Sequence, residues 1–155
     1  MIRRLNIYLK EMYPVIPRLL LGLTMFFEIY FLVILTNGTK SIHINYQEII
    51  GAVTIFTFLL SLRIADEFKD YETDLKLFPE RAFPSGKVKR SDLITLLTVV
   101  IVITIPLNLI FMNNLIYFTI LVVYGIVMSL WFFSKYKIQK SLTLALVTHN
   151  PIQLI

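Results

Sequence analysis

The sequence has no cysteine among its 155 residues, and it contains only five glycines and six prolines. Without cysteine, neither disulfide bonds nor thiolate-ligated metal sites can form. Charged residues are also scarce, at 16%, whereas hydrophobic residues make up 57% and the mean hydropathy is +0.74. A soluble domain has roughly 45–50% apolar residues. The composition therefore indicates an integral membrane protein.

Charge is almost absent from four long stretches, which we expect to cross the bilayer because ~18 or more apolar residues form a transmembrane helix. Only Glu28 interrupts the first stretch, and we expect it to line the bundle interior or to form a hydrogen bond there. Strand-like alternation is absent, so the predicted fold is all-α, a multi-pass transmembrane helical bundle. The predicted spans are residues 19–36, 49–62 with an extension from about residue 46, 93–112 and 115–133.

A further apolar run starts at Ser141 and is too short to cross a bilayer before Ile155. We expect it to begin a fifth helix, which would make the chain the N-terminal half of a larger bundle. No repeat, low-complexity tract or linker divides the sequence. Residues 1–155 are therefore predicted to be a single transmembrane domain with a charged cytoplasmic loop at 63–92.

The basic residues indicate the orientation. Of the 15 Lys and Arg residues, four precede the first span, seven lie in segment 63–92 and three lie in segment 134–140. Only Lys40 lies in a loop predicted on the other side. The positive-inside rule then makes the N-terminus and both basic segments cytoplasmic, and we expect a bacterial inner membrane. The net charge of +5 reflects this topology, so no nucleic-acid partner is expected.

Acidic residues are concentrated between positions 66 and 80, which hold six of the ten in the chain. Neither Gly nor Pro occurs in residues 52–78, so the second span is predicted to continue as a helix to Phe78. At ~100° per residue, part of the acidic stretch then shares one helical face. The residues on this face or at its edge are Asp66, Glu67, Asp70 and Asp74.

Like charges on one face repel unless a cation or a basic partner lies among them, and Arg63 and Lys69 are too few to neutralise four carboxylates. Mg²⁺ prefers such oxygen ligands and usually takes one or two carboxylates with waters and phosphates. The sequence thus predicts a Mg²⁺ site, although a solvated acidic face is the plain alternative. Glu72 points away from this face and is expected to pair with Lys76.

Basic residues follow the acidic stretch, within and after a loop that contains Pro79, Pro84 and a Ser-Gly turn. Carboxylates for a metal ion beside Lys and Arg for anionic oxygens are the components of a diphosphate site. The residues predicted to bind the diphosphate are Arg81, Lys87, Lys89 and Arg90.

The two elements together resemble the signature of the UbiA-type intramembrane prenyltransferases, N-D-x-x-D-x-x-x-D followed by R-P-x-P-S-G. Here D-E-F-K-D-Y-E-T-D occupies 66–74 and R-A-F-P-S-G occupies 81–86. Asp66 stands at the Asn position, Glu67 at the first Asp position, and Ala82 replaces the first Pro. The positions that match without change are Asp70, Asp74, Arg81, Pro84, Ser85 and Gly86.

The resemblance implies a Mg²⁺-dependent enzyme that transfers a prenyl group from a prenyl diphosphate to an aromatic or related lipophilic acceptor. It also implies a second acidic motif, yet no Asp or Glu follows Asp92. We therefore expect these 155 residues alone to be an incomplete enzyme that needs a C-terminal half. The alternative is a non-enzymatic membrane protein that binds or transports a divalent cation.

Overall fold

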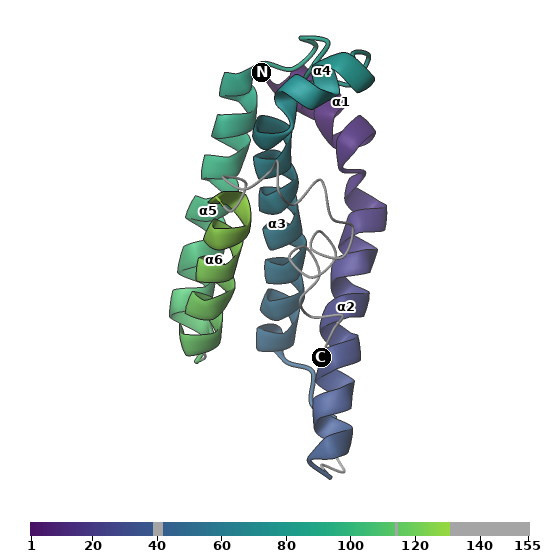
Figure 1. The fold of residues 1–155 in the computed structure, drawn as a ribbon. Coiled ribbons are helices and arrows are strands. Elements are labelled where there is room, and N and C mark those ends of the chain that lie inside the picture. The colour runs from purple at the N-terminus through teal and green to yellow at the C-terminus, as the bar shows by residue number, and fades with distance from the viewer. Residues whose placement is uncertain (39–41, 114, 131–155) are drawn as a thin grey trace, which may run out of the picture.

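A computed structural model describes residues 1–38, 42–113 and 115–130 of the chain. Within these ranges all regular secondary structure is helical, which confirms the all-α class (Figure 1). The fifth helix predicted from Ser141 and the basic segment 134–140 lie outside the described residues. The helices are α1 (Ile2–Met12), α2 (Val15–Thr36), α3 (Tyr46–Lys69), α4 (Tyr71–Leu77), α5 (Arg90–Phe111) and α6 (Leu115–Leu130).

Three of these helices, α2, α3 and α5, are long and apolar enough to cross a membrane, which supports a multi-pass membrane protein. Helix α6 is apolar but only 16 residues long within the described part, so the fourth span stays a prediction. Helix α2 begins at Val15, four residues before the predicted span. Pro17 fits its first turn, because the N–H that proline lacks has no partner within the helix at this position.

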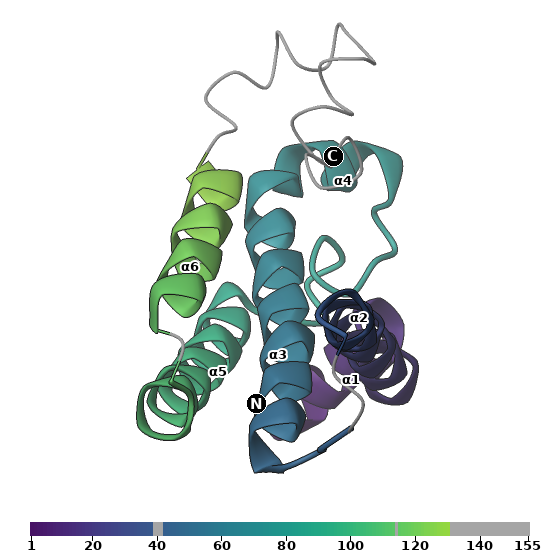
Figure 2. The same ribbon diagram turned by 90° about the horizontal axis from the view of Figure 1, so that it is seen from below.

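Helix α3 is the centre of the bundle and packs against α2, α5 and α6 (Figures 1 and 2). Its start is capped by the carboxylate of Glu48, which accepts a hydrogen bond of 2.6 Å from the backbone N–H of Asn45. Gly22 is the one buried residue of α2, and it lies against the backbone of Phe56 in α3. Helices α1 and α4 lie at the same end of the bundle (Figure 1).

The segment between α4 and α5 folds back as the predicted turn. The backbone N–H of Ser85 donates to the carbonyl of Arg81 at 3.0 Å, and that of Val88 donates to Ala82 at 3.0 Å. Gly86 has a φ of 77°, a left-handed conformation that favours glycine. The turn thereby buries Ala82 completely, although this residue replaces a proline of the family signature.

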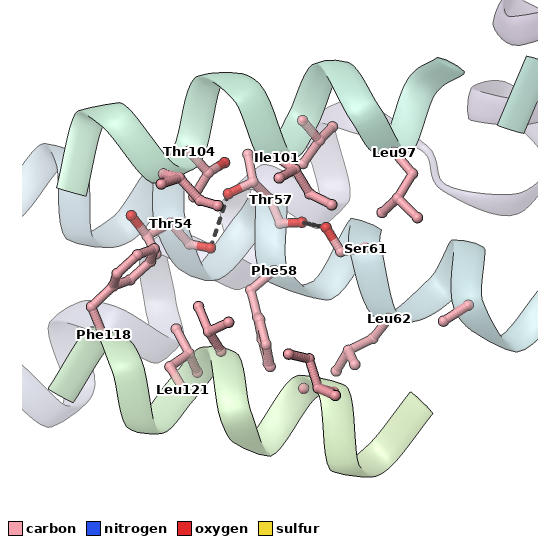
Figure 3. Close-up of a pocket in the computed structure, with 16 residues that line it drawn as sticks. Thr54, Thr57, Phe58, Ser61, Leu62, Leu97, Ile101, Thr104, Phe118 and Leu121 are labelled. Atoms are coloured by element: carbon pink, nitrogen blue, oxygen red, sulfur yellow. Dashed lines mark hydrogen bonds between the residues drawn. The ribbon is translucent and has the colours of Figure 1, made fainter. Parts of the chain in front are cut away.

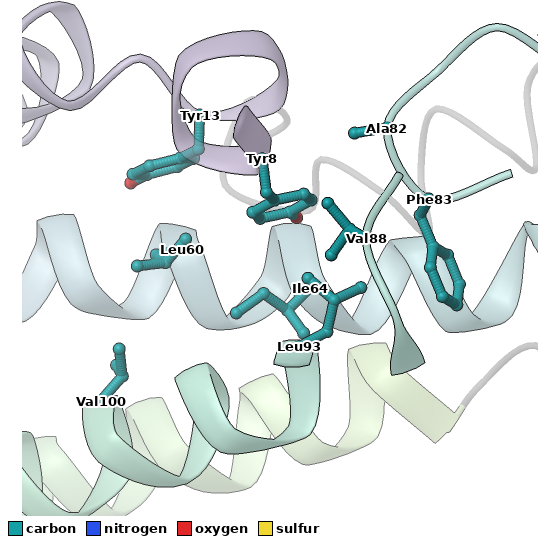
Figure 4. Packing of buried hydrophobic residues seen from close by; sticks show 9 residues of the cluster. All are labelled: Tyr8, Tyr13, Leu60, Ile64, Ala82, Phe83, Val88, Leu93 and Val100. Atoms are coloured by element: carbon teal, nitrogen blue, oxygen red, sulfur yellow. The ribbon is translucent and has the colours of Figure 1, made fainter. Parts of the chain in front are cut away.

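The main core lies at the same end of the bundle and joins α1, α3, α5 and the turn (Figure 4). Two tyrosines anchor α1 in it, and the hydroxyl of Tyr13 donates to the carbonyl of Phe56 at 2.7 Å. The core includes Ile64 of α3, just before the acidic stretch begins at Asp66. Its buried apolar residues are Tyr8, Tyr13, Leu60, Ile64, Ala82, Phe83, Val88, Leu93 and Val100.

An ion pair also fixes α1 to α5. Arg4 donates from Nε to one carboxylate oxygen of Asp92 at 2.6 Å and from a terminal nitrogen to the other at 2.9 Å. Asp92 is buried and also accepts the backbone N–H of Lys89 at 3.1 Å, which caps the start of α5. Residues 1–12, which precede all spans in the sequence, therefore become part of the bundle end.

Candidate functional site

The predicted straight helix through residue 78 is wrong, because the chain bends at Asp70. Asp70 has φ −99° and ψ 8°, and it ends α3 and precedes α4. Aspartate favours helix ends because its short side chain competes for nearby backbone groups. The bend takes Asp74 off the axis of α3, so the four acidic residues do not form a single row.

Asp66 and Asp70 stay together on the last turn of α3 and are the accessible pair. Their side chains are 43% and 37% exposed. Lys69 lies between them: its ammonium group pairs with Asp66 and lies 3.8 Å from a carboxylate oxygen of Asp70. Two carboxylates spaced four residues apart on a helix lie on one face. They can therefore bind one cation jointly.

Glu67 points into the core instead and is only 1% exposed. One of its oxygens accepts a hydrogen bond of 2.7 Å from Arg63, one helical turn earlier. Its other oxygen is buried without a hydrogen-bond partner, as is the hydroxyl of Tyr8. Burial, followed by the negative charge of Glu67, raises the pKa of Tyr8 above its usual range.

Asp74 pairs with the loop that follows it. Arg81 donates to a carboxylate oxygen of Asp74 at 3.1 Å, and its guanidinium group lies 3.8 Å from the centre of the Phe78 ring. Asp74 is buried, whereas the Arg81 side chain is 32% exposed. This contact fixes Arg81 at the bundle end with part of its guanidinium available to a ligand.

The other predicted diphosphate-binding residues are exposed on the turn and at the start of α5. Lys87 donates to the carbonyl of Glu80 at 2.9 Å and lies 3.9 Å from Glu11 of α1. The guanidinium of Arg90 lies 5.5 Å from the centre of the Phe68 ring, and Lys89 is exposed just before α5. Pro84, Ser85 and Gly86 shape the turn that carries these residues.

The structure shows that local basic residues pair with all four predicted metal ligands, although Arg63 and Lys69 alone do not reach Asp74. Arg63, Lys69 and Arg81 together supply the partners. Within the described ranges, no three carboxylate or imidazole groups gather closely enough to hold a metal ion. The donor set that remains is two exposed carboxylates, which fits Mg²⁺ with waters and phosphates as its other ligands.

A cavity of about 520 Å³ opens between α3, α5 and α6 (Figure 3). Its wall is largely apolar, since the hydroxyls of Thr54, Thr57 and Ser61 donate to carbonyls of their own helix. Thr104 also lines the cavity, and its hydroxyl has no hydrogen-bond partner among the described residues. Leu62 and Ala65 line its end on α3. They lie one helical turn before Asp66 and Lys69, so the cavity ends next to the exposed carboxylates.

Two further predictions differ from the structure. Glu28 is exposed on α2 and does not line the interior of the described bundle. Glu72 is exposed on α4 as expected, but no ion pair with Lys76 forms in the described part of the chain. Tyr8 was not predicted as part of this end of the bundle, because its only signal in the sequence is its place on the apolar face of an amphipathic helix.

No family model, curated protein or solved structure matches this chain.

Proposed function

We propose that this end of the bundle is a cytoplasmic site for a prenyl diphosphate and Mg²⁺, and that the chain is related to the UbiA-type prenyltransferases. The observation that carries the proposal is the pair of exposed carboxylates, Asp66 and Asp70, between a basic loop and an apolar cavity. A prenyl diphosphate has the matching parts: anionic oxygens that bind a metal ion and basic side chains, and a hydrocarbon chain.

Asp66 and Asp70 would hold the metal ion, with waters and phosphate oxygens as its remaining ligands. When bound, Mg²⁺ stabilises the negative charge on the departing pyrophosphate. Glu67 and Asp74, the other two acidic residues of the signature, are buried and paired with Arg63 and Arg81. In this proposal Asp74 orients Arg81 toward the diphosphate, and Glu67 holds Arg63 next to the exposed carboxylates.

The basic residues would bind the phosphate oxygens. Once the carboxylates bind the metal ion, the ammonium group of Lys69 would leave Asp66 and bind a phosphate oxygen instead. Arg81 is pre-oriented by Asp74 and Phe78, which lowers the conformational entropy lost on binding. Lys87, Lys89 and Arg90 add exposed positive charge on the same loop.

The apolar cavity would hold the prenyl chain and keep water away from it. In the reaction that the resemblance implies, the allylic C–O bond breaks, pyrophosphate departs and the acceptor bonds to the prenyl carbon with loss of a proton. A diphosphate carries up to three negative charges, whereas residues 1–155 contain one acidic motif. We therefore propose substrate binding by these residues and transfer only with a second acidic motif.

The test is binding of farnesyl diphosphate and Mg²⁺ to the 155-residue chain in lipid nanodiscs. Asp66→Asn and Asp70→Asn should each weaken Mg²⁺ binding about tenfold or more, since each removes one of two carboxylate ligands. Glu72→Gln is the matched control, because Glu72 belongs to the same stretch and is exposed on α4. It should leave the affinity unchanged.

Equal damage by Glu72→Gln and Asp70→Asn would contradict the two-carboxylate site. Mg²⁺ binding that does not depend on the diphosphate would instead favour a non-enzymatic protein that binds or transports a divalent cation.

A further inference from the structure

Two buried polar atoms in the core lack a hydrogen-bond partner: the hydroxyl oxygen of Tyr8 and the second carboxylate oxygen of Glu67. Tyr8 is 0% exposed and Glu67 is 1% exposed. Native proteins rarely leave such atoms unpaired, because burial removes their water without replacing it. Each of these atoms is therefore available for a hydrogen bond in a different arrangement of the neighbouring side chains.

The two atoms belong to elements that are packed together. Tyr8 lies on α1, in contact with the core around Ile64, and Glu67 follows Ile64 by one turn on α3 (Figure 4). The negative charge of Glu67 and burial both oppose ionisation of the Tyr8 phenol. Tyr8 therefore remains a hydrogen-bond donor, and a carboxylate oxygen is the strongest acceptor for it.

Arg63 occupies the other oxygen of Glu67 at 2.7 Å. It precedes Asp66 by three residues and Asp70 by seven, so it lies on the same helical face as the exposed carboxylates. Its side chain is 29% exposed, and a guanidinium group matches two phosphate oxygens at once. Arg63 is therefore placed to bind an anion held by Asp66, Asp70 and a metal ion.

If Arg63 turned toward such an anion, the buried carboxylate of Glu67 would lose its ion-pair partner, which is strongly unfavourable. We propose that Tyr8 replaces Arg63 on Glu67 when the diphosphate binds: Arg63 moves to the phosphate oxygens and the Tyr8 hydroxyl donates to Glu67. This inference rests on the proposed function. It makes Arg63 a diphosphate-binding residue and Tyr8 a positioning residue that acts through Glu67.

The probe is inorganic pyrophosphate with Mg²⁺, and the protein is the full chain in nanodiscs. Tyr8→Phe should lower pyrophosphate affinity about tenfold, because a hydrogen bond to a charged group is lost in the bound state. In the absence of ligand, Tyr8→Phe should be at least as stable to unfolding as the wild type, since the removed hydroxyl has no hydrogen-bond partner in the ligand-free structure.

Tyr13→Phe is the matched control, a second buried tyrosine at the end of α1. Its hydroxyl already donates to Phe56, so the variant should be less stable but should bind pyrophosphate with unchanged affinity. A Glu67→Gln background gives a further test, because a neutral amide does not need the Tyr8 donor. In that background Tyr8→Phe should cost no additional affinity.

Wild-type affinity in Tyr8→Phe, or an equal loss in the Glu67→Gln background, would overturn the exchange and leave the proposed function intact. Failure of the wild-type chain to bind pyrophosphate with Mg²⁺ would overturn the proposed function and the exchange together.

Discussion

Replacement of Gly22 by alanine tests how closely α2 packs against α3, the central helix of the bundle. A Cβ atom at Gly22 would lie 3.1 Å from the backbone nitrogen of Phe56 and 3.2 Å from its Cα. Backbone atoms cannot rotate away as a side chain can. The two helices would therefore have to separate by a few tenths of an ångström along their contact.

Two effects of opposite sign determine the stability of Gly22→Ala. Inserting a methyl group into a close-packed contact costs typically 1–3 kcal/mol. Alanine is a better helix former than glycine by about 0.8–1.0 kcal/mol, which offsets part of this cost. The expected result is a net loss of about 1 kcal/mol. Gly22 is the one buried residue of α2, so the cost falls on the contact where this helix lies against the α3 backbone.

The assay is a titration of the protein from dodecylmaltoside micelles with sodium dodecyl sulfate, followed by circular dichroism. Thr24→Ala is the control, since Thr24 is exposed on the same helix and its hydroxyl donates to the carbonyl of Leu20, one turn earlier in that helix. It should change stability by less than about 0.5 kcal/mol. A Gly22→Ala protein that is as stable as the wild type, or more stable, would show that α2 does not approach the α3 backbone at Gly22.

Three other predictions concern the core and the topology. Burial raises the pKa of Tyr13 to about 12 from about 10 in an unfolded chain. Its stabilising effect is thus complete below about pH 10 and is lost as the pH rises through about 12; a detergent titration that is flat over this range would contradict this. Asn108→Ala should cost about 1–3 kcal/mol in the same titration, because it removes the buried 2.8 Å bond to Thr54; a cost no larger than that of an exposed α5 residue would argue against that bond. A cysteine at Ser85, in this cysteine-free chain, should react with an impermeant reagent only in inverted vesicles, and labelling of intact cells would reverse the topology.

The spans and the turn could be predicted from sequence because their causes are local. Length and apolar content place α2, α3 and α5, and two prolines with a Ser-Gly pair place the turn that ends at Gly86. The predicted helix end near Phe78 is also confirmed, since α4 ends at Leu77. None of these features depends on which helices pack together.

The site could be predicted only in part, because its pairings join distant residues. Helical periodicity put Glu67 on the same face as Asp70, but it did not reveal that α1 would bury Glu67. Arg4 and Asp92 are 88 residues apart, and no spacing rule links them. After the bend at Asp70, Asp74 pairs with Arg81, a contact that a single-helix projection does not contain.

The ion pairs also change the reason to expect a metal ion. The sequence suggested that four carboxylates would repel one another unless a cation joined them, yet Lys69, Arg63 and Arg81 already balance them. A metal ion alone would have to displace Lys69, and a diphosphate that bound to Arg63, Lys69 or Arg81 alone would have to draw that residue from its carboxylate. The two ligands together satisfy both sets of groups, since the cation takes the carboxylates while the anion takes the bases. An ion-paired site of this kind favours joint binding of Mg²⁺ and diphosphate over binding of either one, and the coupling must be reciprocal.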